Sequence, residues 1–192
     1  AGDPYDQPAW TAPGILSDRT GGVVMRLRRL IVMRHAESPW EAVEAPDHER
    51  PLGVVGREQG PRVGATLVEK GRLPEIVLSS DAQRTRETFA GLSEAFVTKV
   101  EVRFLSSFYQ FGQAAAEDEM LMLPETVSCA LLLGHNPGWE HLVEALTGKA
   151  IAMEPATAVV VSQELNSWRD AASAGQWELE DVILPGLPPA ED

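Results

Sequence analysis

Residues 30–36 of the chain read LIVMRHA. Four apolar residues in a row, two of them β-branched, are typical of a strand that is buried on both faces of a parallel sheet. Arg34 and His35 follow directly, so two polar side chains are expected at the carboxyl end of this strand. Ligands of open α/β sheets bind beyond the carboxyl ends of the strands, and this stretch therefore predicts both a sheet and a site.

The rest of the chain predicts an alternation of strands and helices. Further strands are expected at residues 75–79, 100–104, 127–133, 157–165 and 176–183. Helices are expected at 57–70, at 81–96 with Ser80 or Asp81 as N-cap, at 114–123, and at 138–146 with Gly148 as the end. This order predicts a three-layer α/β/α sandwich with a mainly parallel central sheet. The last two strands lack a clear helix between them and are expected to add an antiparallel edge.

The composition is that of a globular protein with an uneven charge distribution. The 192 residues carry a net charge of −13, yet residues 26–86 hold 11 of the 16 basic and 9 of the 29 acidic side chains. An acidic protein repels nucleic acid and anionic membranes, and neither is expected as a partner. A small cationic site within it suits a compact anion such as phosphate.

Composition, the length of apolar runs and the cysteine count predict the domain boundaries and the cellular compartment. Residues 1–24 are rich in proline and glycine and are expected to be a disordered or non-native extension. Residues 25–184 are expected to form one domain, with 185–192 as a tail. The apolar run before Arg34 is too short for an export signal or a membrane span, so a cytoplasmic location is expected. The single cysteine, Cys129, cannot form an internal disulfide and fits a reducing compartment.

Three predicted strands end in residues that can do chemistry. The first ends in Arg34 and His35, the second leads to Arg84, and the fourth ends in the sequence GHNPG at 134–138, which contains His135. Arginine matches phosphate oxygens with a rigid fork of donors, and a neutral imidazole is a nucleophile toward phosphorus. No zinc-type ligand spacing is present, so neither a metal nor a cofactor is expected. The pattern favours phosphoryl transfer through a phosphohistidine.

The same segments resemble the motifs of the histidine phosphatase superfamily, which has the phosphoglycerate mutase-like fold. The resemblance rests on LIVMRHA at 30–36, VLSSDAQRTRET at 77–88 and LLLGHNPG at 131–138. It is closest to the short SixA-type phosphohistidine phosphatases, whose pattern also has a tryptophan after the Arg-His pair and the run DHERPL at 47–52. The motifs span residues 27–184 in the family's order.

The resemblance implies a role for each matching residue. His35 resembles the nucleophile, and His135 resembles the second histidine, which donates to a phosphoryl oxygen. Arg34, Arg50 and Arg84 resemble the phosphate clamp, and Asn136 the residue that positions its loop. Glu37 departs from the pattern, because that branch often has lysine there; this carboxylate either weakens the binding of anions or carries a proton.

The general acid of ester-cleaving members is missing from its usual segment. Residues 104–112 read FLSSFYQFG and hold no carboxylate. An alkoxide needs a proton to leave, whereas imidazole needs little help, and general acid catalysis is worth ~10²–10⁴-fold. The sequence therefore favours a phosphohistidine-bearing protein as substrate over a sugar phosphate. Glu37 or the acidic run at 117–119 could still supply a proton.

Two other functions remain open at this point. One is a small-molecule phosphomonoesterase acting on a small phosphorylated substrate, and the other is a non-catalytic module that binds phosphohistidine. His48 and His141 are not expected in the site. Packing is favoured for Trp40 over lining the pocket mouth, whereas Tyr109 is as consistent with facing the site as with facing away. The sequence does not indicate an oligomeric state.

Overall fold

The computed structural model describes residues 25–40, 46–172 and 176–186. The predicted extension at 1–24 and most of the predicted tail at 185–192 lie outside the described residues, so these domain boundaries stay predictions. No helix in the described part of the chain is long and apolar enough to cross a membrane.

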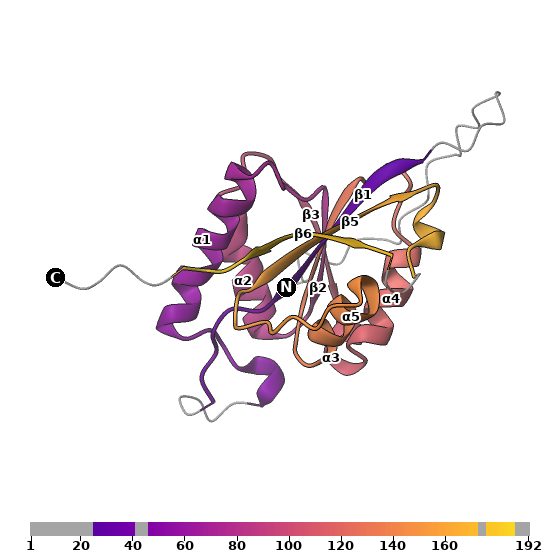
Figure 1. Ribbon diagram of the computed structural model, residues 1–192. Helices are drawn as coiled ribbons and strands as arrows, with labels where there is room; N and C mark the ends of the chain where they lie inside the picture. The colour runs from indigo at the N-terminus through magenta and orange to yellow at the C-terminus, as the bar shows by residue number, and fades with distance from the viewer. Residues whose placement is uncertain (1–24, 41–45, 173–175, 187–192) are drawn as a thin grey trace, which may run out of the picture.

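A six-stranded sheet forms the middle layer (Figure 1). The strands are β1 (Arg26–Arg34), β2 (Ile76–Ser80), β3 (Glu101–Leu105), β4 (Cys129–Gly134), β5 (Ala158–Leu165) and β6 (Glu178–Ile183), in the spatial order β3-β2-β4-β1-β5-β6. The first four are parallel. β5 runs antiparallel to β1, and β6 antiparallel to β5. The predicted antiparallel addition is confirmed, with β5 as an inner strand and β6 at the edge.

Helices cover both faces of the sheet, because its central strands are apolar on both faces. On one face lie α1 (Val54–Glu69) and α2 (Gln83–Ser93); on the other lie α3 (Ser106–Gln110), α4 (Gln113–Leu121) and α5 (Gly138–Thr147). Strand β4 shows the reason for the two layers: Ala130 and Leu132 join the α4–α5 core, whereas Leu131 and Leu133 join the α1–α2 core. The predicted three-layer α/β/α sandwich is confirmed.

Three glycines of α1 bring this helix close to the end of β1. Gly56, Gly60 and Gly64 are four residues apart and share one helix face. A Cβ on Gly56 would overlap the backbone carbonyl of Glu37, and one on Gly64 would overlap that of Leu92. The missing side chains let α1 touch both α2 and the loop after β1, which fixes the position of that loop.

The predicted start of the second helix is wrong. Helix α2 begins at Gln83 with Ala82 as N-cap, not with Ser80 or Asp81. Ser80 is still the last residue of β2, and its hydroxyl is bound to His135. Asp81 uses its carboxylate for His48. Both candidate caps are therefore engaged in tertiary contacts. The short helix α3 and the single-turn helix Asp47–Glu49 were not predicted.

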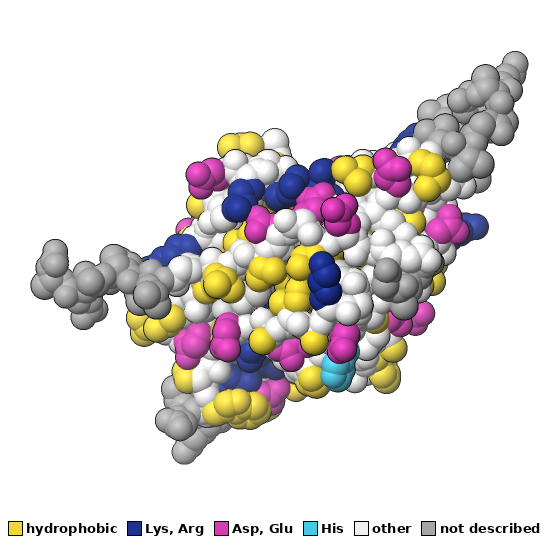
Figure 2. All heavy atoms as spheres, in the orientation of Figure 1, with side chains coloured by type: hydrophobic (Ala, Val, Ile, Leu, Met, Phe, Trp, Pro, Cys, Tyr) yellow, Lys and Arg dark blue, Asp and Glu magenta, His cyan; other side chains and the backbone are white. Residues whose placement is uncertain are grey.

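Four of the eleven basic side chains of residues 26–86 form ion pairs with acids from outside this stretch. Arg29 and Arg72 contact Glu180, Lys70 contacts Asp181, and Arg28 contacts Glu125. Figure 2 shows acidic and basic side chains interspersed on one face of the molecule. These pairs offset part of the basic surplus of this stretch, and three further arginines, Arg34, Arg50 and Arg84, converge on a pocket.

Candidate active site

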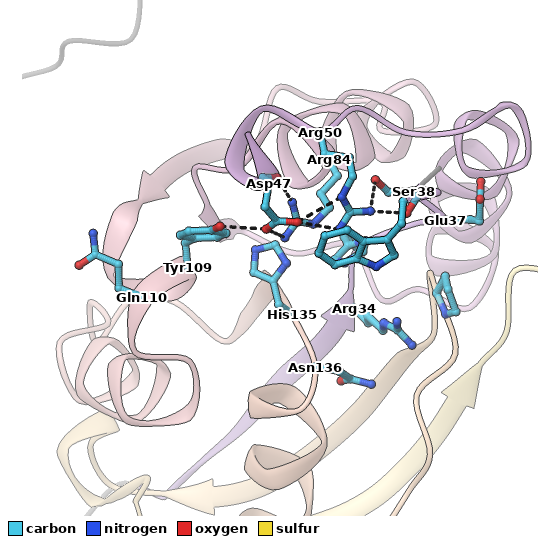
Figure 3. A pocket seen from close by; sticks show the side chains of 13 residues that line it. Arg34, Glu37, Ser38, Asp47, Arg50, Arg84, Tyr109, Gln110, His135 and Asn136 are labelled. Carbon is cyan, nitrogen blue, oxygen red and sulfur yellow. Dashed lines mark hydrogen bonds and ion pairs between the residues drawn. The ribbon is translucent and has the colours of Figure 1, made fainter. Parts of the chain in front are cut away.

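The carboxyl ends of β1, β2 and β4 meet at one edge of the sheet, and a pocket opens there. In the parallel register Arg34 lies opposite Gly134, and Ser79 lies opposite Leu133. The pocket has a volume of about 800 Å³. All seven residues singled out in the sequence line it: Arg34, His35, Glu37, Arg50, Arg84, His135 and Asn136 (Figure 3).

His35 is held as a neutral imidazole with one nitrogen free for chemistry. Its Nδ1 lies 2.7 Å from the carbonyl oxygen of Ala36. A carbonyl oxygen only accepts, so Nδ1 carries the proton and donates it. Burial, together with the nearby charges of Arg84 and Arg34, lowers the pKa of His35 to about 3. The lone pair of Nε2 is therefore available at neutral pH, as a nucleophile requires.

His135 lies beside His35, with ring centroids 5.1 Å apart. Its Nε2 is 2.8 Å from the hydroxyl oxygen of Ser80, which also accepts the backbone N–H of Ala82. The Ser80 hydroxyl proton is thus free to donate to Nε2, which leaves Nδ1 as an N–H donor. Burial and the neighbouring His35 lower the pKa of His135 to about 2. This neutral imidazole can give a phosphoryl oxygen a hydrogen bond.

Three arginines face the pocket from three different segments. Arg34 ends β1 and donates to the carbonyl of Met153 at 2.8 Å. Arg84 lies in the first turn of α2, and Arg50 lies in the loop before α1. Arg50 and Arg84 are buried, with exposed fractions of 6% and 4%. Burying a guanidinium is costly unless it meets an anion, so this clustering is typical of an anion site.

Buried polar atoms without a partner gather at the pocket. Among the described residues they include Nε of Arg34, Nε of Arg84, Nδ1 of His135 and Oδ1 of Asn136. Buried donors are normally satisfied, and those left over at a pocket mark a place built for a ligand. Three of these four atoms are N–H donors, which fits a phosphoryl group as the ligand.

Sequence reasoning missed Asp47 and left Tyr109 undecided. The Asp47 carboxylate accepts hydrogen bonds from Arg50, Arg84 and the Tyr109 hydroxyl, the last at 2.8 Å. Tyr109 also contacts the His135 ring edge to face. Asp47 is the first residue of the run DHERPL, three residues before Arg50, and its place in this run was the signal for it in the sequence.

The remaining predictions about site residues have mixed outcomes. Trp40 lines the pocket mouth and is 74% exposed, so the favoured packing role is wrong. It lies over the Arg50 guanidinium, 4.1 Å from its carbon to the ring centroid. The amide of Asn136 donates to the carbonyl of Met153 at 3.0 Å, the same oxygen that anchors Arg34. His48 and His141 do not line the pocket, as predicted.

Glu37 and Asp47 are the carboxylates among the described pocket residues. Burial opposes ionisation of Asp47, but the Tyr109 hydrogen bond and the charge of Arg84 outweigh it and lower its pKa. Asp47 is therefore ionised at neutral pH and has no proton to donate. The acidic run at 117–119 does not line the pocket.

No group of three or more metal-ligating side chains able to hold an ion occurs among the described residues.

Burial of neutral His35 should make the fold less stable in acid. The imidazole has a pKa of about 6.5 in an unfolded chain and of about 3 in the folded protein. Between these values the unfolded state binds the extra proton, so stability rises with pH across this window and falls as the solution is acidified. Between pH 7 and pH 5 we expect a loss of about 1–2 kcal/mol from this histidine.

Urea unfolding at pH 5 and pH 7 tests this expectation. The variant His35→Ala should lose less stability between the two pH values than the wild type, while His141→Ala, at an exposed position of α5, should match the wild type. An equal pH dependence in His35→Ala and the wild type would show that His35 is not held neutral by burial.

Comparison with known proteins agrees with this geometry. A family model described as histidine phosphatase superfamily (branch 1) matches residues 30–106. An uncharacterized chloroplastic protein of Arabidopsis thaliana is 34% identical over 171 residues, which cover 82% of this chain and 78% of the relative.

Solved structures share the whole architecture. A SixA from Nakamurella multipartitia, provisionally described as a phosphohistidine phosphatase, has a TM-score of 0.71 and 27% identity, covering 83% of this chain and 97% of that one. The protein histidine phosphatase SixA in complex with tungstate has a TM-score of 0.66 and 19% identity, covering 82% of this chain and 97% of that one. The chain therefore belongs to the histidine phosphatase superfamily and is a phosphatase with the phosphoglycerate mutase-like fold.

Proposed function

We propose that this protein hydrolyses protein phosphohistidine without a metal, through a covalent phosphohistidine on His35. The observation that carries the proposal is the state of His35: a neutral imidazole whose Nδ1 donates to the Ala36 carbonyl, in a pocket lined by three arginines. A nucleophile ready at neutral pH beside a cationic clamp is what phosphoryl transfer needs.

The proposed reaction has two displacements at phosphorus. In the first, Nε2 of His35 attacks, the bond from phosphorus to the substrate imidazole breaks, and the electron pair leaves with that imidazole. In the second, water attacks the phosphoryl group on His35, its proton passes to solvent, and His35 is regenerated with inorganic phosphate as product. Arg34, Arg50, Arg84 and His135 are proposed to stabilise the charge on the phosphoryl oxygens.

The choice of a phosphohistidine substrate follows from the proton donors of the pocket. Asp47 is held ionised by its neighbours, and Glu37 is the other carboxyl group among the described lining residues. An alkoxide leaving group would suffer from the lack of an acid, whereas imidazole is a much better leaving group. The likeness to a SixA provisionally described as a phosphohistidine phosphatase supports the same choice.

A phosphorylated protein is also compatible with the pocket mouth. Trp40 and Gln110 are exposed at the rim, and the volume of about 800 Å³ exceeds what a phosphate group alone would fill. We propose the cytoplasm as the compartment, in which a phosphoprotein partner would be met. The plant relative is described as chloroplastic, so the compartment can differ within this group.

A substrate panel tests the proposal. Initial rates with a phosphohistidine peptide, p-nitrophenyl phosphate and several sugar phosphates should be compared in the presence of a chelator. We expect the phosphohistidine peptide and p-nitrophenyl phosphate to be cleaved, because imidazole and nitrophenolate leave without an acid. Sugar phosphates should be slower by about 10²-fold or more, the worth of a missing general acid.

Two outcomes would contradict this proposal in different ways. A preference for sugar phosphates would favour a small-molecule phosphomonoesterase and make Glu37 the first candidate for the proton donor. Tight binding of a phosphohistidine peptide without turnover of any substrate would favour a non-catalytic binding module.

A further inference from the structure

Asp47 occupies the arginine clamp with a charge of the same sign as the proposed substrate. Its Oδ1 accepts from Nε and Nη2 of Arg50 at 3.2 and 3.1 Å. Its Oδ2 accepts from Nη2 of Arg84 at 3.1 Å and from the Tyr109 hydroxyl at 2.8 Å. Figure 3 shows the carboxylate between these partners. The clamp thus holds an internal anion.

The hydrogen bonds of each arginine show what this contact costs an incoming phosphate. A guanidinium has five N–H donors. Arg50 uses Nε and Nη2 for Asp47, and Nη1 contacts both the carbonyl and the hydroxyl oxygen of Ser38. Arg84 uses Nη1 for the Asp47 carbonyl and Nη2 for its carboxylate, while Nε stays unpartnered. Most donors of Arg50 and two of Arg84 are therefore already engaged.

A carboxylate and a phosphate compete for such donors, because both are anions that accept charge-assisted hydrogen bonds. We propose that Asp47 is an internal competitor of inorganic phosphate, which shares Arg50 and Arg84 with the phosphoryl site and keeps the product from binding tightly. The inference rests on the proposed function, since it assumes that phosphate binds in this pocket. It assigns Asp47 a positioning role, through the arginines, that sets affinity for the product.

The surroundings of Asp47 allow its side chain to yield. It belongs to the single-turn helix Asp47–Glu49, and its side chain is 31% exposed, so it can turn toward water when phosphate arrives. The contact from Arg84 to the backbone carbonyl of Asp47, at 2.7 Å, does not depend on the carboxylate. Replacing the side chain therefore removes the internal anion while one anchor of Arg84 remains.

Inhibition by inorganic phosphate, measured against p-nitrophenyl phosphate, tests the proposal. In Asp47→Asn we expect the inhibition constant for phosphate to fall about tenfold, because a like charge is removed a few ångströms from the anion. KM should fall with it, while kcat should not rise. Asp47→Glu, which keeps the charge, should return the inhibition constant to within about threefold of the wild type.

A matched control separates this effect from net charge. Asp81→Asn removes the same charge from a carboxylate that contacts His48 and does not line the pocket, so phosphate inhibition should stay near that of the wild type. Asp47→Ser provides a second variant in case the asparagine variant does not fold, and it should also bind phosphate more tightly.

A result that contradicts the role of Asp47 can be distinguished from one that contradicts the proposed function. Weaker or unchanged phosphate inhibition in a folded Asp47→Asn or Asp47→Ser protein would overturn the proposal and leave Asp47 as a residue that only aligns the arginines. A wild-type protein that neither turns over a phosphorylated substrate nor binds phosphate would instead reject the phosphoryl site, and with it the proposed function.

Discussion

Replacing His35 with alanine should abolish turnover, with a fall in kcat of about 10⁴-fold or more, as expected when a covalent nucleophile is removed. His135 is near, at 5.1 Å between ring centroids, but its Nε2 is bound to Ser80 and its role is that of a donor. No other imidazole lines the part of the pocket that the structure describes. The lost nucleophile therefore has no substitute.

Phosphate binding should survive this replacement in part, because the arginines remain. Rapid-quench experiments with labelled substrate, stopped in base to preserve an acid-labile N–P bond, should trap a phosphoenzyme in the wild type and none in His35→Ala. The control His141→Ala, on the exposed face of α5, should keep full activity and full labelling. Turnover within tenfold of the wild type in a folded His35→Ala protein would refute the assignment of the nucleophile.

The sequence predicted the sheet and the convergence of its strand ends because both depend on local patterns. The apolar runs of β1, β2 and β4 are long enough to indicate buried strands. Parallel strands have their carboxyl ends at one edge, so His35, Ser80 and His135 had to lie near one another. Resemblance added Arg50, which lies in a loop and has no local pattern of its own.

Asp47 and Tyr109 could not be placed in the same way. Their hydrogen bond joins residues 62 positions apart, from a single-turn helix and from the five-residue helix α3. Helices this short carry too few residues for a periodic pattern, and their position depends on tertiary packing. The segment after β3 holds no carboxylate, but the Asp47 carboxylate reaches the pocket from a different segment of the chain.

Tertiary contacts also explain why the predicted N-cap of α2 is wrong. Ser80 and Asp81 are good capping residues by type, and local preference favours either of them. In the fold, Ser80 orients His135 and Asp81 holds His48, at 2.8 Å in both cases. Both polar groups are engaged in tertiary contacts with histidines, which local sequence preference does not reveal.

Removal of Arg84 should have the next largest effect on catalysis. Arg84 lies in the first turn of α2 and lines the pocket together with both histidines, and its buried Nε has no partner. Loss of one preorganised donor to a developing oxyanion typically costs about 10²–10³-fold in kcat. We expect Arg84→Gln to fall in this range. Arg84→Lys should recover only part of the loss, because an ammonium keeps the charge and lacks the planar fork.

The control is Arg86, two residues along the same helix. Its Nε donates to the carbonyl of Asp81, and its guanidinium packs over Phe104 outside the pocket. Arg86→Gln should change kcat by less than about threefold, because the Arg86 side chain does not line the pocket and salt screens charges that lie farther from the reacting group. Equal losses in the two variants would mean that Arg84 acts through the general charge of α2. A loss confined to Arg84, with lysine intermediate, would mean that directed hydrogen bonds to the phosphoryl group carry its contribution.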